Sequence, residues 1–180
     1  MIDRDKALEL PTRKRLYDEI NRSPGIHFRE LKRRTGLAIG ELQYHLDVLD
    51  KVHLVRLQKR GKFIRYFPLV GEHTESEKLT LGLLREESVR KIILLLIEKK
   101  RATNRQLSMF LELAPSTVSF HMQKLLKSGL VEKKRTPKKT YFHLVNPKEA
   151  KRLLTTYRKS FFDELVDSFV EVWEGIPPEK

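Results

Sequence analysis

The apolar and polar positions of the first 70 residues predict three helices followed by two strands. Apolar residues recur at helical spacing in the first three segments, and a short turn of about three residues separates the second helix from the third. The third helix has one apolar stripe that would face a core, made by Leu42, Leu46 and Leu49. The predicted segments are helices over 12–21, 28–35 and across 42–49, and strands over 54–57 and 63–67.

The same plan occurs again about 76 residues further along the chain. ELQYHLDVLDKVHLV (41–55) resembles STVSFHMQKLLKSGLV (116–131), with an aromatic residue before a histidine in both. Seven matched pairs share this offset: Leu31 and Leu107, Leu37 and Leu113, His45 and His121, Leu49 and Leu125, Lys51 and Lys127, Leu54 and Leu130, Val55 and Val131. RYFPLV (65–70) then matches TYFHLV (140–145) at an offset of 75, which predicts that one residue is lost in a hairpin turn. We therefore expect two copies of one fold, each of about 60 residues.

Helix-end signals support this segmentation. Thr103 and Gln106 are predicted to form a capping box, whereas His27 would cap the matching helix of the first copy. Pro115 suits the first position of the second copy's third helix, and Gly129 suits a left-handed position after it. The residue in the corresponding place of the first copy is His53, which we expect to have a positive φ. Helix, helix, tight turn, helix and hairpin together form a helix-turn-helix with a wing.

The predicted fold is thus mainly α with small β-hairpin wings. It comprises two tandem winged helix-turn-helix domains and a long C-terminal helix. The expected parts are a first winged-helix domain with a short N-terminal segment over 1–70, a linker and short helix over 71–87, a second winged-helix domain over 88–146 and an amphipathic helix over 147–175. We expect the polar stretch 71–77 to be the linker, and the leucines after it to form the short helix between the domains.

The C-terminal segment has a wide stripe of apolar and aromatic residues. The stripe repeats every fourth residue and consists of Leu153, Tyr157, Phe161, Leu165, Phe169 and Trp173. It is broader than a domain of this size needs, which favours a homodimer formed through this helix. The alternative is that the helix folds back on its own chain, for example against residues 2–10.

The charge of the chain points to a polyanionic partner. The net charge is +13 and the pI about 10. Residues 161–180 hold six acids and one base, so the first 160 residues carry +18. The alternative is a solvated basic surface. The absence of cysteine excludes disulfides, thiolate metal sites and cysteine catalysis. Without an apolar leader or membrane-length stretch, we expect a cytoplasmic protein, and the high charge with few amides favours a thermophilic source.

The residues also resemble a known family. SMFLELAPSTVSFHMQKLLKSGLVEKKR is similar to the helix-turn-helix core of ArsR- and MarR-like winged-helix regulators. PGIHFRELKRRTGLAIGELQYHLDVLDKVHLVRLQKRGKFIRYFP resembles archaeal regulators that carry two such domains in tandem. The resemblance covers about residues 11–70 and 88–146, and it implies sequence-specific DNA binding and transcriptional control. One departure is Glu41, which stands where the second copy has Thr117; the first domain then binds DNA more weakly, or Glu41 accepts a hydrogen bond from cytosine.

The third helices and the wings are the parts predicted to contact double-stranded DNA. On the second copy's third helix, short hydroxyls, an amide and an aromatic ring would reach base edges in the major groove: Ser116, Thr117, Ser119, Phe120, Gln123 and Lys124. The first copy offers a poorer set, Gly40, Glu41, Gln43 and Tyr44, with Gln43 as its best base reader. Cations for phosphates are Lys59, Arg60 and Lys62 in one wing and Lys133, Lys134, Arg135, Lys138 and Lys139 in the other.

Other functions fit the sequence less well. The six histidines have no HExxH spacing, and we expect His45 and His121 to be structural or close to phosphates; no metal or cofactor is predicted. Without a glycine-rich phosphate loop or nucleophile elbow, we do not expect an enzyme. The main alternative is a winged-helix scaffold that binds proteins in a larger assembly. RNA binding fits less well, because no sheet is expected to display stacking aromatics.

Overall fold

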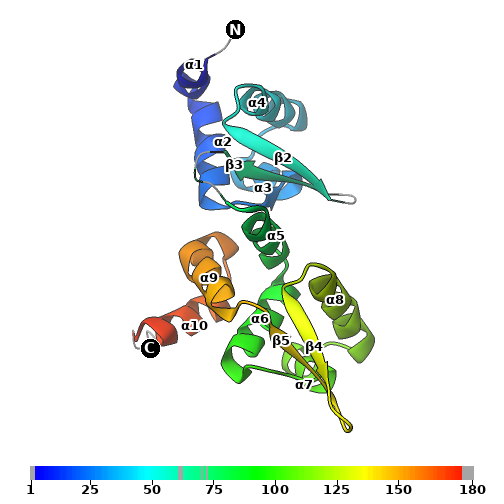
Figure 1. Cartoon of the computed structure of the whole chain (residues 1–180). Coiled ribbons are helices and arrows are strands. Elements are labelled where there is room, and N and C mark those ends of the chain that lie inside the picture. Colours follow the sequence, from blue (N-terminus) through cyan, green and yellow to red (C-terminus); the bar gives the residue numbers. More distant parts are fainter. Residues whose placement is uncertain (1–2, 61–62, 70, 72, 176–180) are drawn as a thin grey trace. The chain divides into compact units, whose positions relative to one another are not determined.

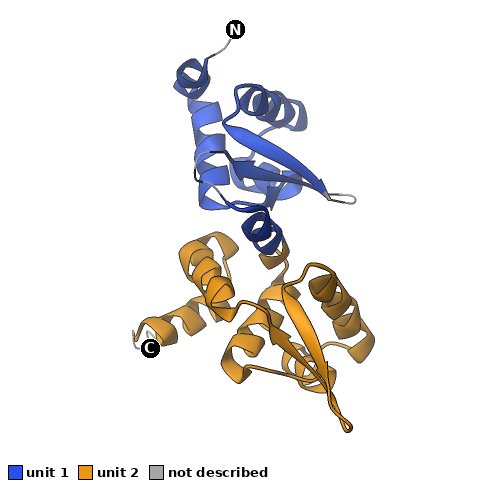
Figure 2. Ribbon diagram, in the orientation of Figure 1, with its two compact units in different colours: residues 1–82 blue, residues 83–180 orange. Residues whose placement is uncertain are grey.

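The computed structural model of the chain describes residues 3–60, 63–69, 71 and 73–175. The chain divides into two compact units, residues 1–82 and 83–180 (Figure 2). Each unit contains one copy of the repeat, and the C-terminal helices belong to the second unit.

The first unit has the predicted three helices and hairpin, together with two short elements that the sequence did not predict (Figure 1). Helix α1 and strand β1 are too short, at six and two residues, for a periodic pattern to show. Strand β1 pairs with β3, so the sheet is antiparallel in the order β1-β3-β2. The elements are α1 (Arg4–Glu9), α2 (Pro11–Arg22), β1 (Ile26–His27), α3 (Phe28–Thr35), α4 (Ile39–Lys51), β2 (Val55–Arg60) and β3 (Phe63–Pro68), followed by α5 (Glu75–Leu84).

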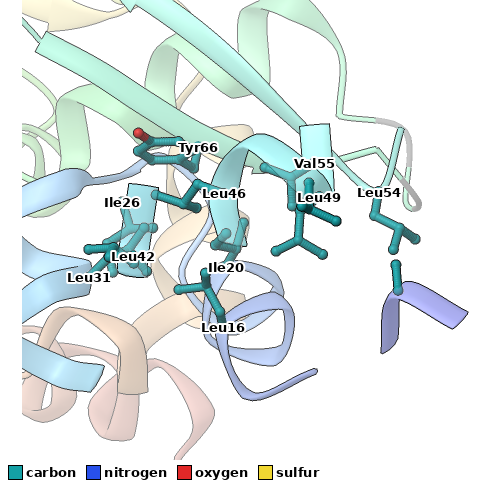
Figure 3. Close-up of a cluster of buried hydrophobic side chains, with 12 residues drawn as sticks. Leu16, Ile20, Ile26, Leu31, Leu42, Leu46, Leu49, Leu54, Val55 and Tyr66 are labelled. Atoms are coloured by element: carbon teal, nitrogen blue, oxygen red, sulfur yellow. The ribbon is translucent and has the colours of Figure 1, made fainter. Parts of the chain in front are cut away.

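The core of the first unit lies between helices α2 and α4 and the small sheet. Figure 3 shows Leu42, Leu46 and Leu49 from the stripe of α4 directed into this cluster, and each is at most 1% exposed. Leu16 and Ile20 of α2 complete the cluster and are fully buried. Each such side chain contributes about 1.5–3 kcal/mol by leaving water. This packing leaves the opposite face of α4 free.

The second unit repeats the arrangement and adds two C-terminal helices. The strands β4 and β5 form a two-stranded antiparallel hairpin, and Ala102 makes the bridge to Phe142 that corresponds to the contact of β1 with β3. The elements are α6 (Glu87–Lys99), α7 (Asn104–Leu111), α8 (Pro115–Lys127), β4 (Val131–Arg135), β5 (Thr140–Leu144), α9 (Pro147–Phe161) and α10 (Glu164–Glu174).

The strand register shows that no residue is lost between the two hairpins, so that prediction was wrong. In the first unit Val55 pairs with Pro68, and in the second Val131 pairs with Leu144, an offset of 76 on both strands. Both turns enclose two residues: Arg60 pairs with Phe63, and the Thr136 amide donates to the Lys139 carbonyl at 2.8 Å. RYF (65–67) and TYF (140–142) therefore resemble each other in sequence but lie one position apart in the two hairpins. The backbone pairing determines which residues of the two strands correspond.

The helix ends agree with the sequence signals. The His27 Nδ1 accepts from the Glu30 amide at 3.1 Å, and Thr103 and Gln106 form the reciprocal capping box. Pro115 occupies the first turn of α8. His53 and Gly129 have φ values of 55° and 74°, as expected for the residues that end the third helices.

The C-terminal segment is two helices instead of the continuous helix expected over 147–175. Helix α9 ends at Phe161, and the next residue, Phe162, has a left-handed φ of 50°. The Asp163 carboxylate then caps α10 by accepting from two backbone amides. Asp163 also pairs with Arg90 of α6 at 2.6 Å, and both side chains are less than a tenth exposed. The side chains of Arg85 and Arg90 lie over the ring of Phe161, at 4.6 and 5.3 Å from its centre. The break is therefore held by contacts to Arg90 of α6 and to Arg85, which precedes that helix.

These contacts place part of the apolar stripe inside the second unit. Leu153 is fully buried and Phe161 is 8% exposed, which corresponds to the alternative in which the helix folds back on its own chain. The other four stripe residues, Tyr157, Leu165, Phe169 and Trp173, are partly exposed. Along the described residues, none of the helices combines the length and the apolar character that a membrane crossing requires.

Candidate nucleic-acid interface

Helix α8 is held firmly against α7 by polar contacts at both ends of the turn. The Asn104 side-chain amide donates to the Ser119 hydroxyl at 2.9 Å and to the Pro115 carbonyl at 3.5 Å. The Ser108 hydroxyl donates to the Leu113 carbonyl at 2.5 Å. On its inner side α8 buries Val118, Met122 and Leu125 almost completely. The helix can therefore present its outer face as a rigid surface.

The outer face of α8 contains most of the predicted base readers. Ser116, Thr117 and Gln123 are exposed, and Phe120 is 66% exposed. The described face has no carboxylate, since α8 contains no acidic residue. Hydroxyl and amide groups at these positions have the chemistry to donate to and accept from base edges, and the Phe120 ring has the apolar character to meet a thymine methyl group.

Two residues predicted to contact bases already have partners within the unit. The Lys124 ammonium forms an ion pair with the Glu86 carboxylate, which precedes helix α6, and the Ser119 hydroxyl accepts from Asn104. Glu86 lies 38 residues before Lys124 in the sequence, so no local pattern indicates this pair. Lys124 is consequently less available to DNA than its position on α8 suggested.

The second wing contains five lysines and arginines and one acid between Val131 and Leu144. Figure 1 shows the β4–β5 hairpin extending beyond the helices of its unit. Its five predicted phosphate contacts are all exposed, and no ion pair involves any of them among the described residues: Lys133, Lys134, Arg135, Lys138 and Lys139. The wing's acid, Glu132, pairs with His143 at 2.6 Å on the neighbouring strand. The cations are therefore free to meet an external anion.

Sequence reasoning missed two arginines beside this wing. Arg101 lies with its guanidinium 4.6 Å from the centre of the Tyr141 ring, next to the bridge formed by Ala102. Arg105 is exposed in the first turn of α7. The signal that could have revealed Arg101 is its position directly before the extended residue that pairs with the wing.

The first unit presents a different outer face. Gln43, Tyr44 and Glu41 are exposed on α4 as predicted, and Tyr44 is 59% exposed. In the first wing Lys59 is exposed, whereas the side chain of Arg60 and the whole of Lys62 lie outside the described residues. Phe63 and Ile64 at the start of β3 are 59% and 39% exposed.

The two matched histidines lie close to the cores of their units. His45 is 6% exposed, with its Nε2 3.8 Å from the Glu41 carboxylate and no hydrogen-bond partner for its buried Nδ1. Burial lowers the pKa of His45 and the nearby Arg13 lowers it further, while Glu41 acts in the opposite direction. His121 likewise has a buried Nδ1 without a partner. Within the described ranges, we find no cluster of three or more side chains suited to binding a metal.

The positive charge is distributed unequally between the units. Residues 1–82 have 17 lysines and arginines against 12 acids, a net charge of +5. Residues 83–160 have 19 against 6, a net charge of +13, and the acidic segment after them reduces the total. A polyanion would therefore be attracted most strongly to the winged part of the second unit.

Comparison with known proteins agrees with this division of the chain. A family model described as an N-terminal HTH (helix-turn-helix) domain matches residues 11–81, and one described as winged helix-turn-helix DNA-binding matches residues 85–132. The chain is also 28% identical over 144 residues to an uncharacterized HTH-type transcriptional regulator of Methanocaldococcus jannaschii. That match covers 80% of this chain and 36% of the relative, so the chain spans about a third of the relative's length. The predicted tandem arrangement is confirmed.

Proposed function

This chain carries two winged helix-turn-helix domains in tandem, and from that premise we propose that it regulates transcription by binding double-stranded DNA in a sequence-specific manner. The observation that carries the proposal is the second wing, with five exposed cations that are free of internal ion pairs among the described residues. Beside it, α8 presents hydroxyls and an amide with no acid. A protein-binding scaffold would instead favour an apolar outer face on this helix.

In the proposed complex, the two parts of the domain have separate roles. Helix α8 enters the major groove, where Thr117 and Gln123 contact base edges and Phe120 contacts thymine. The wing lies along the backbone, where its lysines and Arg135 neutralise phosphates and release counterions. Affinity then comes mainly from the wing and sequence preference from the helix.

Salt dependence tests the proposal directly. Each phosphate contact contributes about −0.9 to the slope of log affinity against log salt, so four or five wing contacts predict a slope of roughly −4. The measurement is a titration of labelled duplex DNA between 50 and 200 mM salt, where affinity should fall by roughly two orders of magnitude. Affinity that does not change with ionic strength would overturn the proposal.

Two variants separate backbone contacts from base contacts. Lys138→Ala combined with Lys139→Ala should weaken binding to all sequences alike and reduce the slope by about 2. Thr117→Ala should instead change the preferred sequence when bound duplexes are selected from random DNA. Lys148→Ala with Arg152→Ala removes the same charge from α9 and should have little effect. If Lys138, Lys139 and Thr117 variants all shift affinity uniformly, the assignment of base readers is wrong.

We also propose that the chain forms a homodimer through its C-terminal helices. In support, α9 and α10 leave large apolar side chains in solvent: Phe162 is 74% exposed and Val172 is 68% exposed. Phe169 and Trp173, two residues of the predicted stripe, are partly exposed on the same helix as Val172. A two-fold dimer would suit a pseudo-palindromic site, because each half-site then meets an identical surface.

A further inference from the structure

The equal length of the two hairpins allows the two copies to be compared residue by residue. Because the offset of 76 holds through helices and strands alike, each exposed position of α8 and its wing has a defined counterpart in the first unit. The counterpart of Thr117 is Glu41, and that of Gln123 is Asp47.

At these positions the first copy carries acids where the second carries neutral polar groups. Glu41 and Asp47 are both exposed, and the Glu41 side chain is 48% exposed. The cation among the exposed residues of α4 is Lys51, in its last turn. Val48 occupies the position of Lys124 and is 8% exposed. The outer face of α4 is thus acidic over most of its length.

The wings differ in which strand positions carry a cation. The counterparts of Lys133, Lys134 and Lys139 in the first wing are Leu57, Gln58 and Phe63. Conversely, the first hairpin has Arg56, Arg60 and Arg65 where the second has Glu132, Thr136 and Tyr141, so each hairpin contains five lysines and arginines at different positions. The 59% exposed ring of Phe63 stands at a position where the second copy can meet a phosphate.

These exchanges have a direct electrostatic consequence. DNA carries one negative charge per about 1.7 Å of helix axis, so a carboxylate brought between two phosphate backbones is repelled unless a base donor compensates it.

Resting on the proposed function, we infer that the two copies are unequal: α8 reads the DNA sequence, and the carboxylates of α4 keep that helix out of the major groove. Each chain then reads one half-site instead of two. The competing possibility is that Glu41 or Asp47 reads a cytosine amino group, which is an outcome of the experiment below.

The experiment exchanges the matched residues between the copies in the full-length chain. Thr117→Glu with Gln123→Asp should lower DNA affinity by about 100-fold or more, because two carboxylates enter a helix that lies in the groove, at roughly 1–3 kcal/mol for each lost base contact. Glu41→Thr with Asp47→Gln should leave affinity unchanged or raise it, and the sequence selected from random DNA should stay the same. All four positions are exposed, so the thermal unfolding midpoint of each variant should stay close to that of the wild type.

The outcomes distinguish this inference from the proposed function. If the Glu41 and Asp47 variant binds tenfold more weakly or selects a different sequence, α4 reads DNA and the inference is overturned. It is equally overturned if the Thr117 and Gln123 variant binds as the wild type does. A wild-type chain that does not bind DNA at all overturns the proposed function, and the inference with it.

Discussion

At the scale of single residues, His45 shows how burial determines the charge of a side chain. It lies beneath the outer face of α4, with Glu41 on one side and Arg13 nearby. Removal from water disfavours the imidazolium form more strongly than Glu41 favours it, so the pKa of His45 is lower in the folded chain than its usual value of 6.5. The folded state therefore favours the neutral form of this histidine.

A pH dependence of stability follows. Because the folded pKa is lowered, the contribution of His45 to stability is fully present above pH 6.5 and is lost as the pH falls through the folded pKa. We expect the free energy of unfolding in urea to decrease between pH 7.5 and 5.5, and His45→Gln to reduce this decrease. A wild type that becomes more stable on acidification over this range would contradict the prediction.

At the residue scale, the sequence predicted which residue types lie on the outer face of α8 better than it predicted which of them are free to contact DNA. The types of residue on α8 follow from its apolar stripe, because the positions of Val118, Met122 and Leu125 determine which side is free. The engagement of Lys124 by Glu86 could not be predicted, since it joins segments that approach only in the folded unit.

At the scale of elements, the junction of α9 and α10 is the main departure from the predicted fold. The apolar periodicity continues through residues 161–165, and Phe162-Asp163 contains neither glycine nor proline to mark an end. What ends α9 is the left-handed conformation of Phe162, and the Asp163 cap then starts α10. The buried pair of Asp163 with Arg90 fixes the position of the break, a tertiary cause that no local pattern reveals.

The left-handed Phe162 predicts an unusual substitution effect. A side chain at φ 50° costs about 1 kcal/mol relative to glycine. We therefore expect Phe162→Gly to be more stable than Phe162→Ala by about 1 kcal/mol in urea unfolding.

The alanine variant is the appropriate control, because both substitutions remove the ring together with every contact that the ring makes. An alanine variant as stable as the glycine variant would show that the backbone at this position carries no strain.

At the scale of the whole molecule, the internal repeat made the fold predictable. The apolar positions match between the two copies, so the prediction of a helix-turn-helix and a wing rests on two separate stretches of sequence. The unequal surfaces of the copies are equally visible in the sequence, but the strand register is needed to align the wings. An offset of 75 would have paired Phe63 with Lys138 instead of Lys139.

The proposed homodimer is a prediction at this scale. Two chains of 21.3 kDa should sediment as one species of about twice that mass. Val172→Asp, which places a charge among the exposed apolar residues of α10, should yield a species of 21.3 kDa.

Val145→Asp is the matched control, since Val145 is also apolar and 55% exposed but lies outside the two C-terminal helices. The dimer proposal fails if the wild type itself sediments at 21.3 kDa, or if both variants dissociate equally.

The constant spacing between the two copies also bears on how the gene can change. A crossover between the coding segments of the two matched stretches would delete 76 codons and leave the reading frame and every strand pairing intact. Its product would be a single hybrid domain, with an acidic or a neutral polar outer face on its third helix according to where the exchange occurred, and still attached to the C-terminal helices. A single recombination event could therefore produce a shortened chain with one domain.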